Sequence, residues 1–431
     1  MLHTNMGINE AGHLTFAGQD TVLLAKQYKT PLYLLDENRI RENCRAYKKA
    51  MKDNFGYEDG VLFASKALSF KGIYKIMADE NMCIDVVSPG ELYTAIKAGF
   101  PVSRGYFHGN AKTDEDIEFA IDSGIGHFVA DNREELVKIN EYAGKKGIKQ
   151  KVILRITPGI DPHTHAAITT GKVDSKFGTP IETGQAEEIV SFALGLENIK
   201  LDGYHCHVGS QCFDPKPFCD AADIMIKFCK DMENKFGFKC EILNLGGGIG
   251  VRYIEEHPKI SCAEFLGKMA DHIKNSCKNL GVDMPKILIE PGRSIVADAG
   301  MTLYTVQSVK TITGYKSYTA IDGGMPDNPR YALYQSDYEV MIANKADRPK
   351  DFVCTVAGRC CESGDLIGED MKLQTPERGD ILAVAVTGAY NYAMASNYNR
   401  LGKPPIVMLK DGESRVVVKR ETFDDLMSQD V

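Results

Sequence analysis

Short apolar segments rich in β-branched residues alternate with amphipathic segments from about residue 60 to residue 300. A short apolar run is typical of a buried strand, and an apolar position at every third or fourth residue is typical of a surface helix. The strand pattern occurs at residues 61–65, 83–87, 105–108, 127–130, 151–156, 201–208, 241–245 and 286–290. About eight strands that alternate with helices suit a closed parallel (β/α)8 barrel, which places this region in the α/β class.

Two of the intervening segments carry clear helix signals. Residues 90–98 follow Ser88, a predicted N-cap, and precede Gly99, a predicted stop. The segment that starts at Asp131 has an acidic first turn, which complements the helix dipole.

The pattern changes after about residue 300. Strand-like runs follow one another with few long helical patterns between them, at residues 301–309, 317–321, 351–356, 380–386 and 405–409. We therefore expect a (β/α)8 barrel over residues 36–300 and an all-β, β-barrel-like domain over residues 301–431. The first 35 residues, around Leu14, are expected to add a strand to the β domain.

Composition and charge exclude several classes of protein. The 431 residues are 43% hydrophobic, and no apolar run approaches the roughly 18 residues of a membrane span. The formal net charge of −8 and the absence of a Lys/Arg-rich segment argue against nucleic acid and anionic lipid as partners. The N-terminus has no secretory pattern, and the 12 cysteines contain no CxxC pair, so a cytoplasmic protein with reduced cysteines is expected.

Chemically useful residues follow several of the predicted strands. Lys66 follows the first strand, His207 lies in the sixth, residues 246–248 are a glycine run after the seventh, and Glu290 ends the eighth. Catalytic groups of such barrels lie at the C-terminal ends of the strands, and phosphate sites form after the seventh and eighth. A lysine can form a Schiff base with pyridoxal phosphate, a carboxylate can pair with its pyridine nitrogen, and glycines let backbone N–H groups approach a phosphate. The set indicates a pyridoxal phosphate site.

Each of these residues also has a simpler interpretation. Lys66 alone would be read as a surface lysine, and the glycine run as a tight turn. His205 and His207, a His-x-His pair with both rings on one face of a strand, could begin a zinc site. Zinc hydrolases on barrels tend to carry such a pair on the first strand, whereas here it lies on the sixth, and His163 and His165 lie in a loop-like stretch rich in Pro and Thr. No metal is therefore predicted. Glu290 could instead be a buried partner of an arginine such as Arg155 or Arg293.

Glu290 also bears on the type of reaction. A carboxylate beside the pyridine nitrogen keeps that nitrogen protonated, which makes the ring a strong electron sink. A racemase of similar fold typically has arginine at this position. The carboxylate therefore favours decarboxylation.

The predicted β domain contributes further candidates. Cys361 could donate a proton, Glu362 could bind an ammonium group, and Arg330 has a guanidinium suited to a carboxylate. Tyr390 supplies a phenol and a ring. Each of them alone would be judged structural.

Together these residues make the chain resemble the diaminopimelate decarboxylases, fold type III pyridoxal phosphate enzymes related to eukaryotic ornithine decarboxylase and alanine racemase. The resemblance covers nearly the whole chain. Its motifs are Phe63-Ala-Ser-Lys-Ala, Asp85-Val-Val-Ser-x-Gly-Glu-Leu, Ser175-Lys-Phe-Gly, His207-Val-Gly-Ser-Gln, Gly246-Gly-Gly, Glu290-Pro-Gly-Arg, Cys361-Glu-Ser and Gly388-Ala-Tyr.

The resemblance implies a role for each matching residue. Lys66 would be the Schiff-base lysine, His207 the ring that stacks on the cofactor, and Cys361 the proton donor. Asp85 and Arg155 would either contact the cofactor or brace residues that do. The implied cofactor-binding residues are Lys66, Asp85, Arg155, His207, Ser210, Gly247, Gly248, Glu290, Gly292, Arg293 and Tyr390, and the implied substrate-binding residues are Arg293, Arg330, Tyr334, Glu362 and Tyr390. In the family, Cys361 and Glu362 would reach the site from a partner subunit, which implies a homodimer.

Two departures from the family pattern stand out. Pro89-Gly90 replaces two glycines, which changes a turn, and Tyr390-Asn-Tyr replaces the more usual Tyr-Gly-Phe, which could alter the edge of the pocket. The resemblance implies decarboxylation of meso-2,6-diaminopimelate at its D-centre to L-lysine, the last step of lysine biosynthesis. Two alternatives are a decarboxylase of ornithine, lysine, arginine or carboxynorspermidine, and a catalytically dead homologue that binds a partner.

Overall fold

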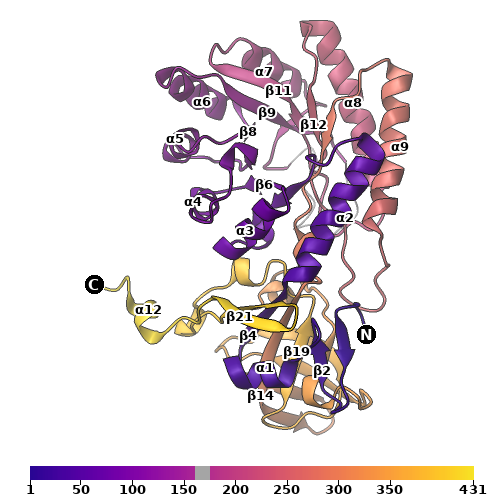
Figure 1. Cartoon of the computed structure of the whole chain (residues 1–431), viewed down its shortest axis with the longest axis vertical. Coiled ribbons are helices and arrows are strands. Elements are labelled where there is room, and N and C mark those ends of the chain that lie inside the picture. The colour runs from indigo at the N-terminus through magenta and orange to yellow at the C-terminus, as the bar shows by residue number, and fades with distance from the viewer. Residues whose placement is uncertain (161–174) are drawn as a thin grey trace. The chain divides into compact units, whose positions relative to one another are not determined.

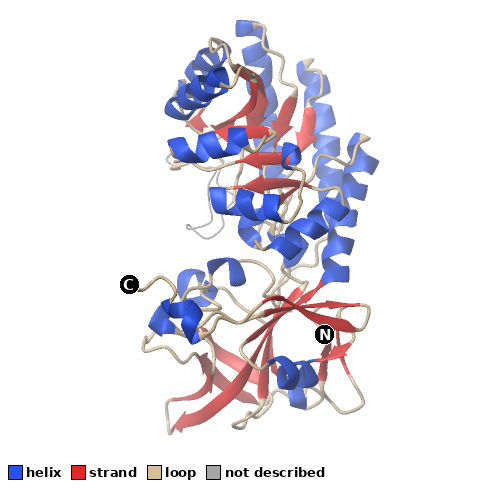
Figure 2. Cartoon of the chain, turned by 60° about the vertical axis from the view of Figure 1, so that its left-hand side comes forward, coloured by secondary structure: helices blue, strands red, loops and turns tan. Residues whose placement is uncertain are grey.

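The computed structural model describes residues 1–160 and 175–431, so His163 and His165 lie outside the described residues. The chain divides into two compact units. We call Cys44–Gly250 with Ile260–Gly292 the barrel unit, and Met1–Asn43 with Val251–Lys259 and Arg293–Val431 the β unit. Figure 1 labels the elements of both units, and Figure 2 colours them by type.

The barrel unit is built on parallel strands in the spatial order β13-β12-β11-β9-β8-β7-β6-β5. A parallel bridge between Val61 and Ile289 joins the two ends of this order. Within the described residues these eight strands form a nearly closed parallel barrel, and the predicted (β/α)8 fold is confirmed. The strands are β5 (Leu62–Ala64), β6 (Cys83–Val86), β7 (Gly105–Phe107), β8 (His127–Ala130), β9 (Gln150–Thr157), β11 (Ile199–His205), β12 (Ile242–Asn244) and β13 (Lys286–Leu288), and β10 (Thr179–Pro180) pairs with β9.

Helices alternate with these strands along the chain and lie outside them in Figures 1 and 2. The helix after β6 starts where the sequence predicted, because the Ser88 side chain accepts a hydrogen bond from the Glu91 N–H and Pro89 takes the first helical position. The Pro89-Gly90 departure thus lies in the first turn of a helix. The helices are α2 (Glu37–Phe55), which starts in the β unit, α3 (Lys71–Asp79), α4 (Pro89–Lys97), α5 (Asp114–Asp122), α6 (Arg133–Lys145), α7 (Gln185–Leu194), α8 (Lys216–Phe236) and α9 (Cys262–Leu280).

A layer of buried side chains fills the barrel. Different strands each contribute one residue to it: Leu62, Cys83, Tyr106, Val129, Ile153 and Leu288. This packing leaves the strand ends as the place where polar groups can gather.

The β unit contains a mixed sheet in the order β18-β17-β15-β14-β4-β20-β21, with β16 and β19 attached beside β14. The long strand β14 pairs with β4, β15 and β19 and is the centre of this sheet. The strands are β4 (Leu32–Asp36), β14 (Gly300–Ile312), β15 (Lys316–Ile321), β16 (Val340–Ile342), β17 (Phe352–Ala357), β18 (Leu366–Leu373), β19 (Ile381–Ala385), β20 (Ile406–Lys410) and β21 (Glu413–Val418), and the short helices are α1 (Thr21–Tyr28), α10 (Arg293–Val296), α11 (Arg330–Tyr334) and α12 (Phe423–Met427).

The N-terminal contribution differs from the prediction around Leu14. β2 (Leu14–Phe16) pairs with β1 (Met6–Ile8) and β3 (Gln19–Asp20) in a separate three-stranded sheet. The strand that joins the main sheet is β4, whose five residues are all buried between β14 and β20. Fully buried strands lack the alternating pattern that marks half-exposed ones, so β4 was harder to see in the sequence.

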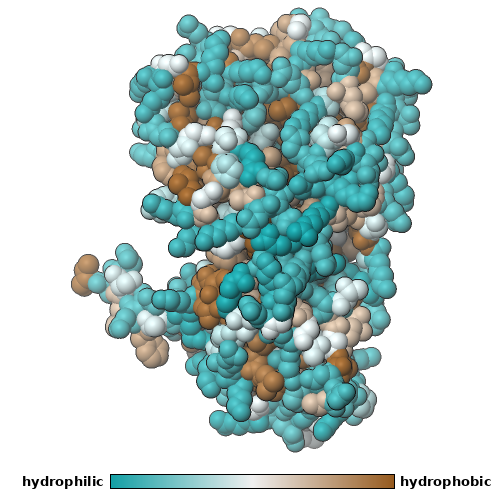
Figure 3. Space-filling view, viewed as in Figure 1, coloured by the Kyte–Doolittle hydropathy of each residue, from teal (hydrophilic) through white to brown (hydrophobic). Residues whose placement is uncertain are grey.

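The face drawn in Figure 3 is mostly hydrophilic, with scattered hydrophobic positions. Within residues 1–160 and 175–431, no helix is long and apolar enough to cross a membrane.

Candidate active site

The predicted site residues of the barrel unit lie at or just beyond the C-terminal ends of its strands. Lys66 lies in the short 3-10 helix that follows β5, and Asp85 lies in β6. His207 follows β11, and residues 246–248 follow β12. Glu290 follows β13, so the positions counted from the sequence after the seventh and eighth strands are confirmed.

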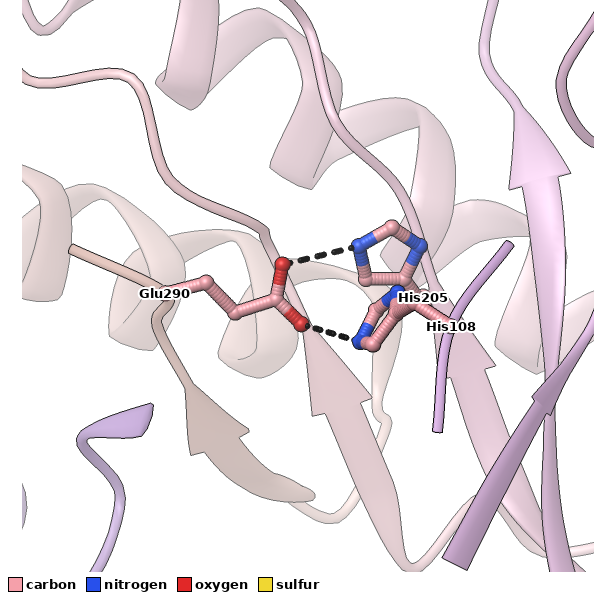
Figure 4. A group of neighbouring side chains, drawn as sticks. All are labelled: His108, His205 and Glu290. Carbon is pink, nitrogen blue, oxygen red and sulfur yellow. Dashed lines mark hydrogen bonds and ion pairs between the residues drawn. The ribbon is translucent and has the colours of Figure 1, made fainter. Parts of the chain in front are cut away.

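Glu290 is buried, only 6% exposed, and nitrogen atoms of three side chains lie close to its carboxylate. Its Oε1 atom accepts a 2.7 Å hydrogen bond from Asn244 Nδ2 and lies 2.8 Å from His108 Nε2. Its Oε2 atom lies 3.3 Å from His205 Nε2, and Figure 4 shows both imidazoles directed at the carboxylate. Burial tends to raise the pKa of Glu290, but His108 and His205 outweigh it and hold the pKa well below the usual range. Glu290 is therefore ionised.

Asp85 lies beside this cluster. It is buried, its Oδ1 atom has no hydrogen-bond partner among the described residues, and that atom lies 3.9 Å from His108 Nε2. Burial raises the pKa of Asp85 to about 6, with Glu290 adding to the rise while His108, Lys66 and Arg155 oppose it. Asp85, Glu290, Lys66 and Arg155 are therefore close enough for their charges to interact, as expected of residues in one site.

His207 is held as a neutral ring. Burial lowers its pKa well below the usual value, and the positive charges of Lys66 and Arg155 lower it further. The Gly247 N–H donates to His207 Nδ1 over 3.2 Å, so the proton of the neutral imidazole is on Nε2. His205 and His207, which the zinc interpretation placed on one face, thus have different partners.

The glycine run allows a close backbone approach that a side chain would prevent. A Cβ atom on Gly247 would lie 2.0 Å from the Glu290 carbonyl oxygen. A Cβ atom on Gly248 would lie 2.0 Å from the Gly209 carbonyl oxygen, and the φ angle of Gly248 is +120°. Ser210 is half-buried in the turn after β11. A lysine, a neutral ring, an ionised carboxylate and a side-chain-free turn are together the donor set that suits pyridoxal phosphate.

Two further predicted residues of the barrel unit have structural surroundings of their own. The guanidinium carbon of Arg155 lies 4.3 Å from the centre of the Phe177 ring, a cation–π distance. A Cβ atom on Gly292 would lie 2.9 Å from the Cβ atom of Ala64, so the chain after Glu290 packs tightly against the end of β5.

A second cluster of predicted residues lies in the β unit around Tyr253. Arg293 donates a 2.9 Å hydrogen bond to the Tyr253 hydroxyl, and its guanidinium carbon lies 4.8 Å from the Tyr390 ring centre. Arg330 lies 5.0 Å from the Tyr253 ring centre and donates a 3.0 Å hydrogen bond to the Tyr338 hydroxyl. Both guanidiniums are buried, so this cluster concentrates two positive charges.

The Tyr390-Asn-Tyr departure falls in this second cluster. Asn391 is buried, and its Oδ1 atom accepts a 3.3 Å hydrogen bond from the Tyr338 hydroxyl that Arg330 contacts. A glycine at position 391 could not make this bond. The departure therefore supports the tyrosine that holds Arg330.

Cys361 and Glu362 are exposed, in the loop between β17 and β18. The Cys361 N–H donates to the Asn399 side chain, and Glu362 accepts from the Gly364 N–H of the same loop. Tyr334 ends α11 and is half-buried.

Sequence reasoning did not assign His108, Asn244, Tyr253 or Tyr338 to the site. His108 ends a predicted strand and Asn244 lies inside one, so their strand positions were the available signal. Tyr253 and Tyr338 lie outside the predicted strands and carried no such signal.

His108, His205 and Glu290 also form a possible metal-ligand set. One ligand atom from each lies within 4.8 Å of the others, and two imidazoles with a carboxylate suit zinc. The prediction that the site holds no metal stays a prediction.

Comparison with known proteins identifies the family. Residues 37–297 match the pyridoxal-dependent decarboxylase family in its pyridoxal binding domain. The diaminopimelate decarboxylase of Bacillus subtilis is 44% identical over 430 residues, which cover 100% of this chain and 98% of that protein. The enzyme of Staphylococcus aureus is 43% identical over 423 residues, with 98% of each chain covered.

Solved structures agree with these sequence matches. The diaminopimelate decarboxylase of M. jannaschii in complex with L-lysine superposes with a TM-score of 0.91 and 35% identity, covering 100% of this chain and 99% of that one. The Helicobacter pylori enzyme complexed with L-lysine gives a TM-score of 0.86 and 33% identity, covering 95% and 98%. With the site geometry described above, these matches show that the chain belongs to the diaminopimelate decarboxylases, a family of pyridoxal phosphate-dependent decarboxylases.

Proposed function

We propose that this protein removes CO₂ from the D-centre of meso-2,6-diaminopimelate and releases L-lysine, the last step of lysine biosynthesis. The observation that carries the proposal is the gathering of Lys66, a neutral His207, a glycine turn and an ionised Glu290 at the strand ends of one barrel. The L-lysine in the solved M. jannaschii and H. pylori relatives supports the identity of the product.

Pyridoxal phosphate, when bound, supplies an aldehyde for an amino group and a ring that accepts the electron pair released when CO₂ leaves. We assign the Lys66 amine to the aldehyde and Glu290 to the pyridine nitrogen. An ionised carboxylate beside that nitrogen keeps the nitrogen protonated. His207 presents a flat, uncharged ring for stacking, which keeps another positive charge away from the cofactor. We assign the phosphate to Ser210, Gly247, Gly248 and the Gly292-Arg293 turn. We expect Asp85, Arg155 and Tyr390 either to contact the cofactor or to support residues that contact it.

The substrate has an amino-acid group at each end and needs two kinds of recognition. Arg293, Arg330 and Tyr334 are assigned to a carboxylate, because a buried guanidinium forms strong paired bonds with it. Glu362 is assigned to the distal ammonium group, and Cys361 Sγ to the proton that replaces CO₂ on carbon.

We further propose a cytoplasmic homodimer in which Cys361 and Glu362 complete the site of the partner subunit. Their exposure on the β17–β18 loop supports this arrangement. We also propose domain boundaries at residues 36–300 and 301–431, with residues 1–35 contributing to the β domain.

Two alternatives keep part of this chemistry. A decarboxylase of ornithine, lysine, arginine or carboxynorspermidine would have no second carboxylate for a buried Arg330. A catalytically dead binding homologue would have no need of Lys66, His207 and Cys361, all of which are present.

The test is product formation from meso-diaminopimelate, run beside L-lysine, L-ornithine and L-arginine with added pyridoxal phosphate. L-lysine and CO₂ from meso-diaminopimelate alone are expected, and the Lys66→Ala variant should lose both turnover and the absorbance band of the covalently bound cofactor. Turnover of another diamino acid instead would overturn the roles of Arg330 and Glu362. A fully active Lys66→Ala variant would overturn the site assignment.

A further inference from the structure

The groups around Glu290 go beyond what a buried carboxylate needs for simple pairing. Nitrogen atoms of Asn244, His108 and His205 converge on its two oxygens at 2.7, 2.8 and 3.3 Å. Each comes from a different strand end of the barrel, β12, β7 and β11. We propose that His108 and His205 are positioning residues that hold the Glu290 carboxylate in one orientation, so that a lone pair of Oε2 stays available. The proposal rests on the proposed pairing of Glu290 with the pyridine nitrogen.

Counting lone pairs identifies the available position. A carboxylate offers about four acceptor sites, two on each oxygen. Asn244 occupies one site of Oε1, and His108 Nε2 lies 2.8 Å from the same oxygen, whereas His205 occupies one site of Oε2. The second site of Oε2 can therefore take another N–H donor, such as a protonated pyridine nitrogen.

Burial makes these contacts necessary for the charge. Glu290, His108 and His205 are 6%, 4% and 1% exposed. A carboxylate so deeply buried takes up a proton unless N–H groups or positive charges stabilise the ionised form. A protonated Glu290 could not hold a proton at the pyridine nitrogen. Removing either imidazole should therefore weaken the charge as well as the orientation.

The two rings are fixed rather than free to follow the carboxylate. Their centres are 4.9 Å apart and their planes are 79° apart, an edge-to-face contact that Figure 4 shows. His205 is paired in the sheet with Asn244 on one side and Arg155 on the other. The backbone N–H of His108 donates to the Val86 carbonyl over 2.8 Å, which ties the residue to the neighbouring strand. Groups held on strands keep a bound partner in place more accurately than groups on loops.

His205 donates as a neutral ring. Burial lowers its pKa to about 4, so near neutral pH it carries one N–H, which Glu290 attracts to Nε2. The other titratable groups that interact with this cluster through their charges are Asp85, Lys66, Arg155, Cys206, His207, Glu91, Asp131 and Tyr106. Because these groups also titrate, the pH dependence of the wild type must be compared with that of the His205 and His108 variants.

The test compares His205→Leu, which removes the donor, with His205→Gln, whose amide can place an N–H near the Nε2 position, and repeats the pair at His108. The first readout is the infrared absorption of the Glu290 carboxyl in the apoprotein, identified by its loss in Glu290→Gln. The second is the Kd for added pyridoxal phosphate, and the third is kcat and KM of the holoenzyme.

The Leu variants should show a protonated Glu290 at a higher pH than the wild type. They should also bind pyridoxal phosphate more weakly and lower kcat by at least about tenfold, the effect of losing one hydrogen bond to a charged group. KM should change much less, because the substrate-binding residues are untouched. The Gln variants should recover a large part of each loss.

His127 provides a matched control. Its Nε2 atom lies 3.0 Å from Asp202 in the same barrel, but His127 begins β8, at the end of the strand away from the proposed site. His127→Leu removes a comparable imidazole–carboxylate contact and should lower thermal stability while leaving cofactor affinity and kcat unchanged.

Wild-type Glu290 titration and kcat in all four His variants would overturn the positioning role, and so would losses that His127→Leu reproduces. Glu290→Gln separates this failure from that of the proposed function. If Glu290→Gln keeps full activity, the pairing of Glu290 with the cofactor is wrong, whereas an inactive Glu290→Gln beside normal His variants overturns the positioning role alone.

Discussion

At the scale of single residues, the glycine turn after β12 lies against the backbone of two other segments, at Glu290 and at Gly209. The space that a side chain would need at Gly247 is filled by the Glu290 carbonyl, and at Gly248 by the Gly209 carbonyl. Backbone atoms cannot move aside as a flexible side chain can, so glycine is required here whether or not a phosphate is bound. The same close approach leaves the N–H of Gly247 directed at His207.

Gly247→Ala should therefore lower stability and weaken cofactor binding together, because the new methyl group would displace the carbonyl of Glu290. We expect a loss of at least about 1–3 kcal/mol in the free energy of unfolding, the range for overpacking a buried site. Urea unfolding and titration with pyridoxal phosphate measure the two effects.

Gly267→Ala is the matched control for that substitution. Gly267 lies inside α9, where a Cβ atom would come no closer than 3.9 Å to another residue. Alanine is the better helix former, so this variant should be as stable as the wild type or more so, by up to about 1 kcal/mol. Equal behaviour of the two variants would contradict the steric argument.

At the scale of elements, the loop between β17 and β18 is held by one buried carboxylate. Asp365 accepts hydrogen bonds from the N–H groups of Met325 at 2.5 Å and Cys360 at 2.7 Å. Cys361 and Glu362 follow directly in this loop and are exposed. Asp365 thus fixes the backbone next to Cys361 and Glu362.

Asp365→Asn should loosen this loop. The two N–H donors use one carboxylate oxygen each, whereas an amide has only one oxygen that can accept. We expect faster hydrogen exchange in residues 358–364 and a fall in kcat of about tenfold, the scale of one lost bond to a charged acceptor. Affinity for pyridoxal phosphate should be unchanged, as its proposed ligands in the barrel unit are untouched. Normal kcat with a loosened loop would argue that the loop has no role in turnover.

The β20–β21 hairpin is tied to the start of α2 by Glu37, whose side chain is buried. Glu37 contacts Arg415 at 2.5 Å, Arg41 at 2.9 Å and Lys410 at 3.0 Å. Burial tends to raise the pKa of Glu37, but these three cations outweigh it and lower the pKa to about 2, from an ordinary value of 4.5.

A folded-state pKa below the unfolded one stabilises the protein above pH 4.5, and this stabilisation is lost as the pH falls towards 2. Glu37→Gln cannot titrate, so its stability should fall less over that window, by about 1–3 kcal/mol when allowance is made for the partly exposed cations. Unfolding by urea at a series of pH values measures the difference. Parallel curves for the two proteins would show that Glu37 does not contribute.

At the scale of the whole molecule, the predicted site residues are divided between the two units. Lys66, His207 and Glu290 belong to the barrel unit, while Arg330 and Cys361 belong to the β unit. The proposed dimer would take Cys361 from the other chain.

Mixing two inactive variants tests this arrangement. Lys66→Ala and Cys361→Ala are each expected to be inactive, but a heterodimer of the two would contain one intact site if sites are shared. Subunit exchange should then restore about a quarter of wild-type activity, since half of the dimers are mixed and each has one working site. No recovery after proven exchange would place both residues in the same chain's site.

Strand periodicity and strand-end chemistry were readable from the sequence because both are local. All eight barrel strands were located to within a few residues, and the N-cap Ser88 marked the start of a helix. β4 and its place in the sheet were missed, since pairing with β14 and β20 joins residues some 270 and 370 positions apart along the chain.

The sequence by itself determined the family, the barrel and the identity of the chemical groups, because each depends on short motifs whose order along the chain can be read directly. Only the tertiary structure decided which groups touch. It placed His108, His205 and Asn244 around Glu290 and gathered Arg293 and Arg330 around Tyr253. Such contacts depend on how strands close into a barrel and how distant loops meet, and the burial they produce sets the charge of each group.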